Sequence, residues 1–290
     1  MRSRSFSLLQ WDRLTNPGLS GRARDREEAV SNIVFDDEVG RIEREIAESH
    51  DLVVRRKIFM DALNLQTSER VLELGCGGGS YAFEAAQFVG STGHVAAIDI
   101  STDQIAAARE RCGRFAWAEC QIANVVDLPY QDGEFDAVYS VQVLEYVDDL
   151  REAFREIHRV LRDGGRFVNI STNWSSCVWY SEDKERMRRV LDGWSAHETH
   201  RDLPTIIAGE LRKAGLQALR QRAVPILNTS FSENRISYWL CKLIPGYVVD
   251  RGAVSQEEAD AWAEEFADLD RRGEYFFSLT PVLTEAIRVS

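Results

Sequence analysis

A glycine-rich turn after a short apolar segment constrains this chain more than any other feature. Residues 71–79 read Val-Leu-Glu-Leu-Gly-Cys-Gly-Gly-Gly, and a helix-like segment follows. This pattern predicts a strand, a tight turn and the start of a helix. Glycines in such a turn allow positive φ and close approach of a ligand to the backbone, so a side chain at Gly77 should block a ligand. By itself the turn does not identify the ligand, since similar turns serve nucleotides, flavins and plain packing.

Two acidic residues limit which ligand the glycine turn can bind. Glu73 lies two residues before the first glycine, where a carboxylate repels a pyrophosphate and suits a cationic amino acid group. Asp99 closes a second apolar segment, 94–100, where an acidic side chain can accept hydrogen bonds from ribose hydroxyls. Ser101 and Gln104 form a capping box for a helix over 103–112, which leaves Asp99 available to the ligand. An ordinary loop or capping role for Asp99 is the alternative.

A second motif follows the third expected strand, which spans about 115–122. Residues 128–147 read Leu-Pro-Tyr-Gln-Asp-Gly-Glu-Phe-Asp-Ala-Val-Tyr-Ser-Val-Gln-Val-Leu-Glu-Tyr-Val, which predicts a loop, an Asp-Gly turn, a strand and a loop that opens a helix. Together the two motifs resemble class I S-adenosylmethionine-dependent methyltransferases, in particular the small-molecule methyltransferases related to ubiquinone and menaquinone biosynthesis enzymes. The resemblance is strong over about residues 50–225 and weak in the C-terminal strand.

The resemblance implies S-adenosylmethionine as co-substrate and SN2 transfer of its methyl group to an N, O, S or C atom of a small molecule. Family members commonly have Asp at the position of Asn124, so here an amide oxygen would accept from the adenine amino group. They usually have His where this chain has Tyr146, so a His base at this position is excluded here. The implied cofactor-binding residues are Glu73, Gly75, Cys76, Gly77, Gly79, Asp99, Ile100, Asn124, Val125 and Gln142.

Apolar strand segments alternate with helical segments, which predicts an α/β fold. The clearest helix spans 149–161 and ends at Gly164-Gly165, ahead of a fifth strand over 166–171. We expect a Rossmann-like, seven-stranded, mostly parallel sheet with helices on both faces and ligands at the carboxyl ends of the strands. Pro281 cannot donate in a ladder, so the last regular strand should begin after it. The residues expected to meet at the site, each following a strand, are Gly75, Asp99, Asn124, Gln142 and Thr172.

Residues beyond the fifth strand are candidates for the acceptor side of the site. Asn173, Trp174 and Tyr180 are assigned to substrate binding, because aromatic faces attract a cationic methyl donor by roughly 0.5 to 2 kcal/mol. Trp179 is assigned to the core. Tyr146 and His197 are the candidates for catalysis, His197 as a general base with a pKa near neutral. A merely solvated loop histidine is the alternative for His197.

The chain divides into an N-terminal arm or lid, 1–40, and a methyltransferase domain, 41–290. Residues 228–273 carry two helical patterns and predict a cap inserted before the last strand. We expect Trp239, Trp262 and Phe266 to roof the substrate cavity with these helices; a dimer interface is the alternative.

Composition limits the partners. A formal net charge of −12 repels a phosphate backbone, so no nucleic acid substrate is expected. No apolar run approaches the roughly 18 residues of a membrane span, and a secretory signal is absent, which favours no membrane contact and a cytoplasmic location. The five cysteines lack metal-ligand spacing, so no metal is expected. The partner is therefore a small-molecule acceptor, and the chain a monomer or homodimer. A non-catalytic S-adenosylmethionine-binding protein and an NAD-linked oxidoreductase are the rival functions, the second disfavoured by Glu73.

Overall fold

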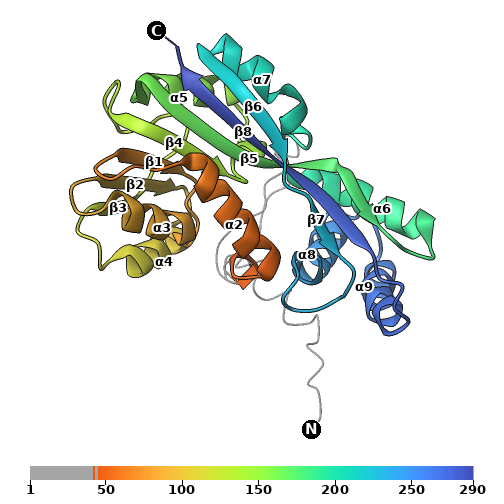
Figure 1. Ribbon diagram of the computed structural model, residues 1–290. Helices are drawn as coiled ribbons and strands as arrows, with labels where there is room; N and C mark the ends of the chain where they lie inside the picture. Colours follow the sequence, from red (N-terminus) through yellow and green to blue (C-terminus); the bar gives the residue numbers. More distant parts are fainter. Residues whose placement is uncertain (1–41, 43–44, 290) are drawn as a thin grey trace, which may run out of the picture. The chain divides into compact units, whose positions relative to one another are not determined.

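The computed structural model describes residues 42 and 45–289, so the expectation of an arm or lid over 1–40 lies outside the described residues. Strands and helices alternate along the first half of this part of the chain (Figure 1). The elements are α2 (His50–Leu63), β1 (Arg70–Leu74), α3 (Ser80–Val89), β2 (His94–Asp99), α4 (Thr102–Cys112), β3 (Ala118–Ile122), β4 (Phe135–Val141), η2 (Leu144–Tyr146), α5 (Leu150–Val160), β5 (Leu161–Trp179), α6 (Lys184–Trp194), η3 (Ser195–His197), α7 (Leu203–Lys213), β6 (Leu216–Ala223), β7 (Ile226–Asn228), α8 (Ile236–Asp250), α9 (Gln256–Arg271) and β8 (Phe277–Arg288).

The strands form one sheet in the order β3-β2-β1-β4-β5-β8-β6, with β7 paired to β8. The first five strands pair in parallel, while β8 runs antiparallel to β5, β6 and β7. The chain order reverses between β1 and β4, and at such a point the carboxyl ends of the strands open a crevice. The expected mostly parallel Rossmann-like sheet is confirmed, with eight strands rather than seven because of the short β7.

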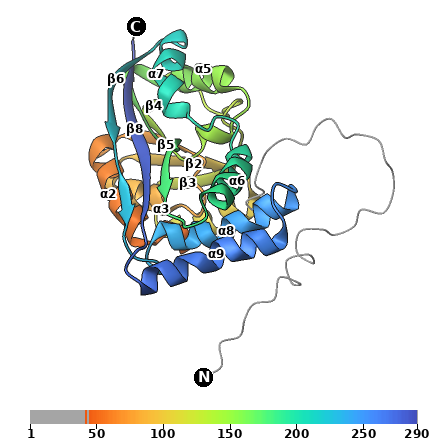
Figure 2. The same cartoon turned by 90° about the vertical axis from the view of Figure 1, so that its right-hand side faces the viewer.

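Helices cover both faces of the sheet because successive strand residues point to opposite sides (Figures 1 and 2). In β1, Val71 packs in a buried cluster with residues of α2, α3 and α4. Its neighbours Leu72 and Leu74 pack in a second cluster with residues of α5 and α7. The buried positions of β1, β2 and β4 are mostly apolar, as expected for strands buried on both faces.

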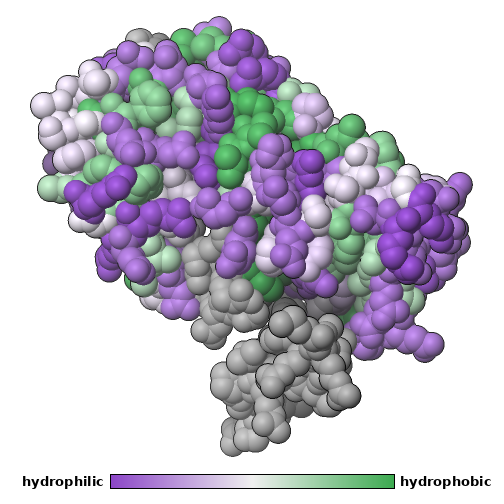
Figure 3. Space-filling model, turned by 60° about the horizontal axis from the view of Figure 1, so that its bottom comes forward, coloured by the Kyte–Doolittle hydropathy of each residue, from purple (hydrophilic) through white to green (hydrophobic). Residues whose placement is uncertain are grey.

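Large hydrophobic side chains at the surface come from several separate elements, among them Leu219 of β6, Leu227 of β7 and Val178 of β5. Figure 3 shows one face, on which hydrophobic areas are interrupted by hydrophilic residues. Of the helices that the structure describes, none combines the length and the apolar character needed to cross a membrane.

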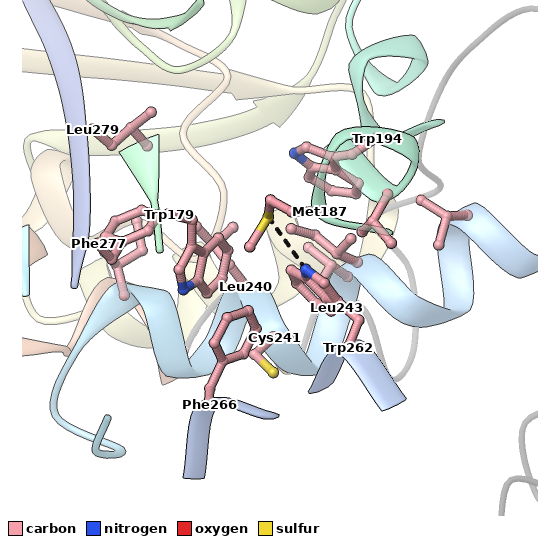
Figure 4. Packing of buried hydrophobic residues seen from close by; sticks show 14 of the residues in the cluster. Trp179, Met187, Trp194, Leu240, Cys241, Leu243, Trp262, Phe266, Phe277 and Leu279 are labelled. Atoms are coloured by element: carbon pink, nitrogen blue, oxygen red, sulfur yellow. Dashed lines mark hydrogen bonds between the residues drawn. The ribbon is translucent and has the colours of Figure 1, made fainter. Parts of the chain in front are cut away.

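A third buried cluster joins α6, α8 and α9 to the far ends of β5 and β8, which extend beyond the other strands (Figures 1 and 4). The ring of Trp179 stacks on Phe266, with centroids 4.6 Å apart, and meets Trp262 edge-on at 5.1 Å. Core packing of Trp179 is thus confirmed. Trp262 and Phe266 are fully buried in this cluster and Trp239 is half-buried at its edge, so these aromatic residues pack α8 and α9 together instead of roofing a cavity.

The sequence misjudged two strands. The fifth was expected to span 166–171, but β5 begins at Leu161, directly after α5, and continues to Trp179. The last strand was expected to begin after Pro281, but β8 begins at Phe277 and passes through it. The carbonyl of Pro281 accepts from Val224 N at 2.8 Å, on the side of β6, and β6 ends at Ala223. The N–H that Pro281 lacks therefore falls at the interruption between β6, which ends at Ala223, and β7, which begins at Ile226.

Candidate active site

A cavity of about 560 Å³ opens at the carboxyl ends of the parallel strands. This volume is typical of sites for small molecules. The five strand-end residues that the sequence placed together all line it, namely Gly75, Asp99, Asn124, Gln142 and Thr172. The reversal of strand order between β1 and β4 explains the place of the cavity.

The glycines of the first motif are required for different physical reasons. Gly75, Gly77 and Gly79 all have positive φ, of 64°, 50° and 77°. A Cβ on Gly75 would lie 2.3 Å from Cγ2 of Val143, and one on Gly79 would lie 3.0 Å from the backbone of Ala108. A Cβ on Gly77 would meet nothing within 4 Å. Gly75 and Gly79 therefore allow close packing, whereas Gly77 borders open space in the cavity; Gly79 itself does not line it.

The Asp99 carboxylate connects the end of β2 to the glycine turn. Its Oδ2 accepts from Gly77 N and its Oδ1 accepts from Ser101 N, both at 2.9 Å. The expected capping bond is present, since Ser101 Oγ accepts from Gln104 N at 3.3 Å. Asp99 nevertheless makes the two backbone bonds described above. A carboxylate has about four acceptor positions, so Asp99 can hold the turn and still accept from a ligand.

Glu73 is almost fully buried beneath the turn. Its Oε2 accepts from the hydroxyl of Tyr139 at 3.1 Å. Burial raises the pKa of Glu73 well above its ordinary value, because the charged form loses its hydration. A cation bound in the cavity would favour the charged carboxylate.

Other predicted cofactor residues lie around the same part of the cavity. Cys76, Ile100 and Val125 line it, with Ile100 exposed at the rim. Asn124 also lines it, and its Oδ1 accepts from Val126 N at 3.3 Å. Gln142 has the left-handed φ of 55°, which is uncommon outside glycine, and its Nε2 donates to Thr172 Oγ1 at 2.5 Å. Such local strain is typical of functional sites.

The second half of the cavity is mostly apolar. Leu52 of α2, Ile226 of β7 and Leu240 of α8 contribute to it. Trp174, a predicted substrate residue, and Tyr146, a predicted catalytic residue, line it as well. The other two predicted substrate residues do not. Asn173 is absent from the lining, and Tyr180 lies at the surface with 42% of its area exposed, because the long β5 carries it past the cavity.

His197 lines the cavity but does not lie in a solvated loop. Its ring is buried and stacks on Trp194, with centroids 3.7 Å apart. Its Nδ1 lies 2.5 Å from the Trp194 carbonyl oxygen. Burial lowers the pKa of His197 to about 3, so the ring is neutral at pH 7 and is a much weaker base than the sequence suggested.

Three charged residues of this region escaped the sequence analysis. Glu198 lines the cavity, and its Oε1 accepts from Trp174 Nε1 at 2.7 Å. Glu145 lies fully buried behind it, and its Oε1 accepts from Thr172 N at 3.1 Å. Arg55 of α2 is buried and also lines the cavity. The Leu-Glu pair of the second motif contains Glu145, but no sequence pattern marks the other two.

Comparison with known proteins agrees with this geometry. Residues 72–169 match the family whose description is "Methyltransferase domain". This segment resembles a methyltransferase domain. It begins within β1, ends within β5 and contains the glycine turn and the second motif, and the resemblance drawn from those two motifs is confirmed.

Curated relatives include quinone methyltransferases. Demethylmenaquinone methyltransferase of Oceanobacillus iheyensis is 29% identical over 44% of this chain and 54% of its own length. The chloroplastic 2-phytyl-1,4-beta-naphthoquinone methyltransferase of Arabidopsis thaliana is 34% identical over 43% of this chain and 46% of its own length. An uncharacterized 37.1 kDa protein in transposon TN4556 of Streptomyces fradiae is 31% identical over 56% of this chain and 46% of its own length. The chain thus spans about half the length of the curated relatives it matches.

Solved structures share the fold over most of the chain. The YcgJ protein of Bacillus subtilis has a TM-score of 0.55 at 19% identity, over 83% of this chain and 99% of its own. The geranyl diphosphate C-methyltransferase of Streptomyces coelicolor, solved with S-adenosyl-L-homocysteine, has a TM-score of 0.54 at 19% identity, over 91% of this chain and 85% of its own. At this identity the likeness concerns the fold alone. It extends beyond the methyltransferase domain into the helices and strands that follow.

Proposed function

We propose that this chain is an S-adenosylmethionine-dependent methyltransferase that acts on a small molecule. The observation that carries the proposal is a cavity with two unlike halves. One half combines the Gly77 turn with the strand-end polar residues Asp99 and Asn124, and the other is mostly apolar. A polar cofactor and an apolar acceptor can then lie side by side, which methyl transfer requires.

The residues of the first half suit the parts of S-adenosylmethionine. Asp99 would accept from the ribose hydroxyls while it holds the turn through Gly77 N. Ile100 and Val125 would cover the adenine, and Asn124 Oδ1 would accept from its amino group. Glu73, whose buried carboxylate would be stabilised by a bound cation, would lie beneath the amino acid part. The co-substrate supplies an activated methyl group, so the protein's main task is to align it with the acceptor and to exclude water.

The second half favours a small, largely apolar acceptor. The relatives named as quinone methyltransferases support this substrate class, and the net charge of −12 disfavours nucleic acids. A cytoplasmic location without membrane or metal partners, and a monomer or homodimer, belong to the same proposal. We further propose residues 41–290 as the methyltransferase domain, with the cap over 228–273: Ile236, Leu240 and Leu243 of α8 line the cavity, whereas no residue of α9 does.

Binding and turnover measurements test the proposal against its rivals. Isothermal titration calorimetry should show binding of S-adenosylhomocysteine and none of NADH; the reverse would favour the oxidoreductase. Formation of S-adenosylhomocysteine from S-adenosylmethionine is then followed with a panel of small apolar acceptors. Tight cofactor binding without turnover on any acceptor would favour a non-catalytic binding protein.

A further inference from the structure

Two buried carboxyl groups belong to the acceptor side of the site: Glu198 lines the cavity, and Glu145 does not. Glu145 comes from η2, after β4, and Glu198 follows η3. The Glu145 side chain is fully buried, and that of Glu198 is 1% exposed. Burial of unpaired carboxylates is costly, so a pair of them in one wall calls for a reason.

Glu198 keeps one oxygen unused. Its Oε1 accepts from Trp174 Nε1 at 2.7 Å and lies 3.3 Å from Nε2 of His197. Its buried Oε2 has no hydrogen-bond partner among the described residues. A buried polar atom without a partner costs about 1 to 3 kcal/mol, and such atoms in native structures commonly serve a ligand or catalysis. Because Glu198 lines the cavity, a molecule bound there is the candidate partner of this carboxyl group.

His197 makes this carboxyl group a better base. The Trp194 carbonyl can only accept, so the short contact with Nδ1 places the ring proton on Nδ1 and a lone pair on Nε2. That lone pair faces Glu198 Oε1 and disfavours a charged carboxylate. In this tautomer the His197 ring favours the protonated form of Glu198 over the charged form.

Glu145 is the second buried carboxyl group, and its pKa depends on the charge of Glu198. It is not part of the lining, and Thr172 N occupies its Oε1. Burial, and then the neighbouring charge of Glu198, raise the pKa of Glu145 to about 8. The pKa of Glu198 is also raised to about 8, mainly by burial; Asp202 adds to the rise, while Arg201 and the Trp174 hydrogen bond oppose it. The positive charge of Arg55 opposes this rise in the pKa of Glu145. A carboxyl group in these surroundings exchanges a proton near neutral pH.

We propose that Glu198 removes the proton from the nucleophile of the acceptor, and that the acceptor is an apolar molecule with a hydroxyl group or an N–H amine. The inference rests on the proposed methyltransferase function. As the bond from the nucleophile to the methyl carbon forms, the carbon–sulfur bond breaks and its electron pair goes to sulfur. The proton of the nucleophile goes to Oε2 of Glu198. Thioethers and tertiary amines carry no such proton and need no base.

The test uses the full chain and Glu198→Gln, which keeps an oxygen for Trp174 Nε1 but cannot take up a proton. The probes are four decyl compounds with one apolar body, namely decylamine, decanol, N,N-dimethyldecylamine and decyl methyl sulfide. We expect turnover of the amine or the alcohol only, and a kcat about 100- to 10,000-fold lower in Glu198→Gln, which is the usual effect of losing a general base. The wild-type rate should rise with pH up to about 8, and the variant should lack this rise.

Two controls separate the possible failures. Glu185→Gln changes an exposed carboxylate on α6 and should behave as wild type. S-adenosylhomocysteine affinity should stay within about twofold in Glu198→Gln, since a general base acts on the reacting proton and not on the cofactor. If the wild type does not bind S-adenosylhomocysteine at all, the proposed methyltransferase function itself is wrong. Wild-type rates in Glu198→Gln, or turnover of the sulfide or tertiary amine alone, would overturn only the role of Glu198.

A spectroscopic measurement decides the matter even if no probe is methylated or the variant folds poorly. Carbon-13 NMR of glutamate-labelled protein with S-adenosylhomocysteine bound gives the Glu198 carboxyl signal, assigned by its absence in Glu198→Gln or by its shift in Glu198→Asp. We expect this signal to titrate near pH 8. A midpoint at the ordinary value of about 4.3 would overturn the proposal.

Discussion

The Gly77→Ala substitution tests whether the glycine turn is built for a ligand. Gly77 has a φ of 50°, and a Cβ there would meet nothing within 4 Å. The cost to the fold is therefore limited to left-handed strain of about 1 to 2 kcal/mol. In a protein of this size about 1 kcal/mol lowers Tm by roughly 2 to 4 °C, so we expect a fall of about 2 to 8 °C in a thermal melt.

The same methyl group should weaken cofactor binding far more. It would occupy space beside the strand-end residues, where the backbone of the turn approaches the ligand. We expect S-adenosylhomocysteine to bind at least about tenfold more weakly by calorimetry, a loss of about 1.4 kcal/mol.

Gly164→Ala is the matched control. Gly164 has a φ of 72°, a Cβ there also meets nothing within 4 Å, and the residue is not part of the cavity lining. Its Tm should fall as in Gly77→Ala while its cofactor affinity stays unchanged. Gly75→Ala should be the least stable of the three, because its Cβ would clash with Val143. Equal affinities of Gly77→Ala and Gly164→Ala would refute the assignment of Gly77 to a ligand.

Three further substitutions test the core, the strand ends and the buried acid. Trp262→Ala should lower the free energy of unfolding by about 3 to 5 kcal/mol in urea titrations, since the ring is fully buried; a loss below about 1 kcal/mol would contradict its packing. Asp99→Asn should weaken S-adenosylhomocysteine binding by about 1.5 to 3 kcal/mol in calorimetry, and unchanged affinity would remove Asp99 from the site. The pKa of Glu145 is about 8 in the folded chain, against an ordinary value of 4.5 that applies in the unfolded chain. The folded state therefore binds this proton more tightly, and the wild type loses stability as the pH rises from about 4.5 to 8. Glu145→Gln should lack this loss in melts at both ends of that range; an unchanged pH dependence would contradict the shift.

The cofactor half of the cavity was predictable because its signals are local. The strand before Gly75, the turn and the helix after it all follow from the order of apolar residues and glycines within a few positions. Strand ends of a parallel sheet meet at one edge, so placing Asp99 and Asn124 required only the strand positions. The separate reasons for each glycine were not predictable, since Val143 and Ala108, which crowd Gly75 and Gly79, lie far away in the sequence.

The acceptor half depends on contacts that no local pattern records. His197 was placed in a polar loop because polar residues surround it in the sequence, yet the fold stacks it on Trp194 and buries it. Burial lowers the pKa of the histidine and raises the pKa of its neighbour Glu198, so Glu198 is the stronger base of the two. A histidine is the residue that sequence reasoning selects as a base, because its ordinary pKa is near neutral. Desolvation reverses that order here, since it lowers the pKa of a histidine and raises that of a carboxyl group.

The length of β5, which the sequence underestimated, explains why an acid lies in this wall at all. Strand β4 ends at Val141, whereas β5 continues past it and leaves Thr172 N without a strand partner on that side. The carboxyl group of Glu145 supplies the missing acceptor at 3.1 Å, and this bond holds the side chain in the interior. Its second oxygen then has no partner among the described residues, and the charge of Glu198 helps to raise the pKa of Glu145. Where a local rule fails in a native protein, a functional site is the usual reason. The extended strand thus connects the least predictable part of the sheet to Glu145, the buried neighbour of the acid that we assign to proton transfer.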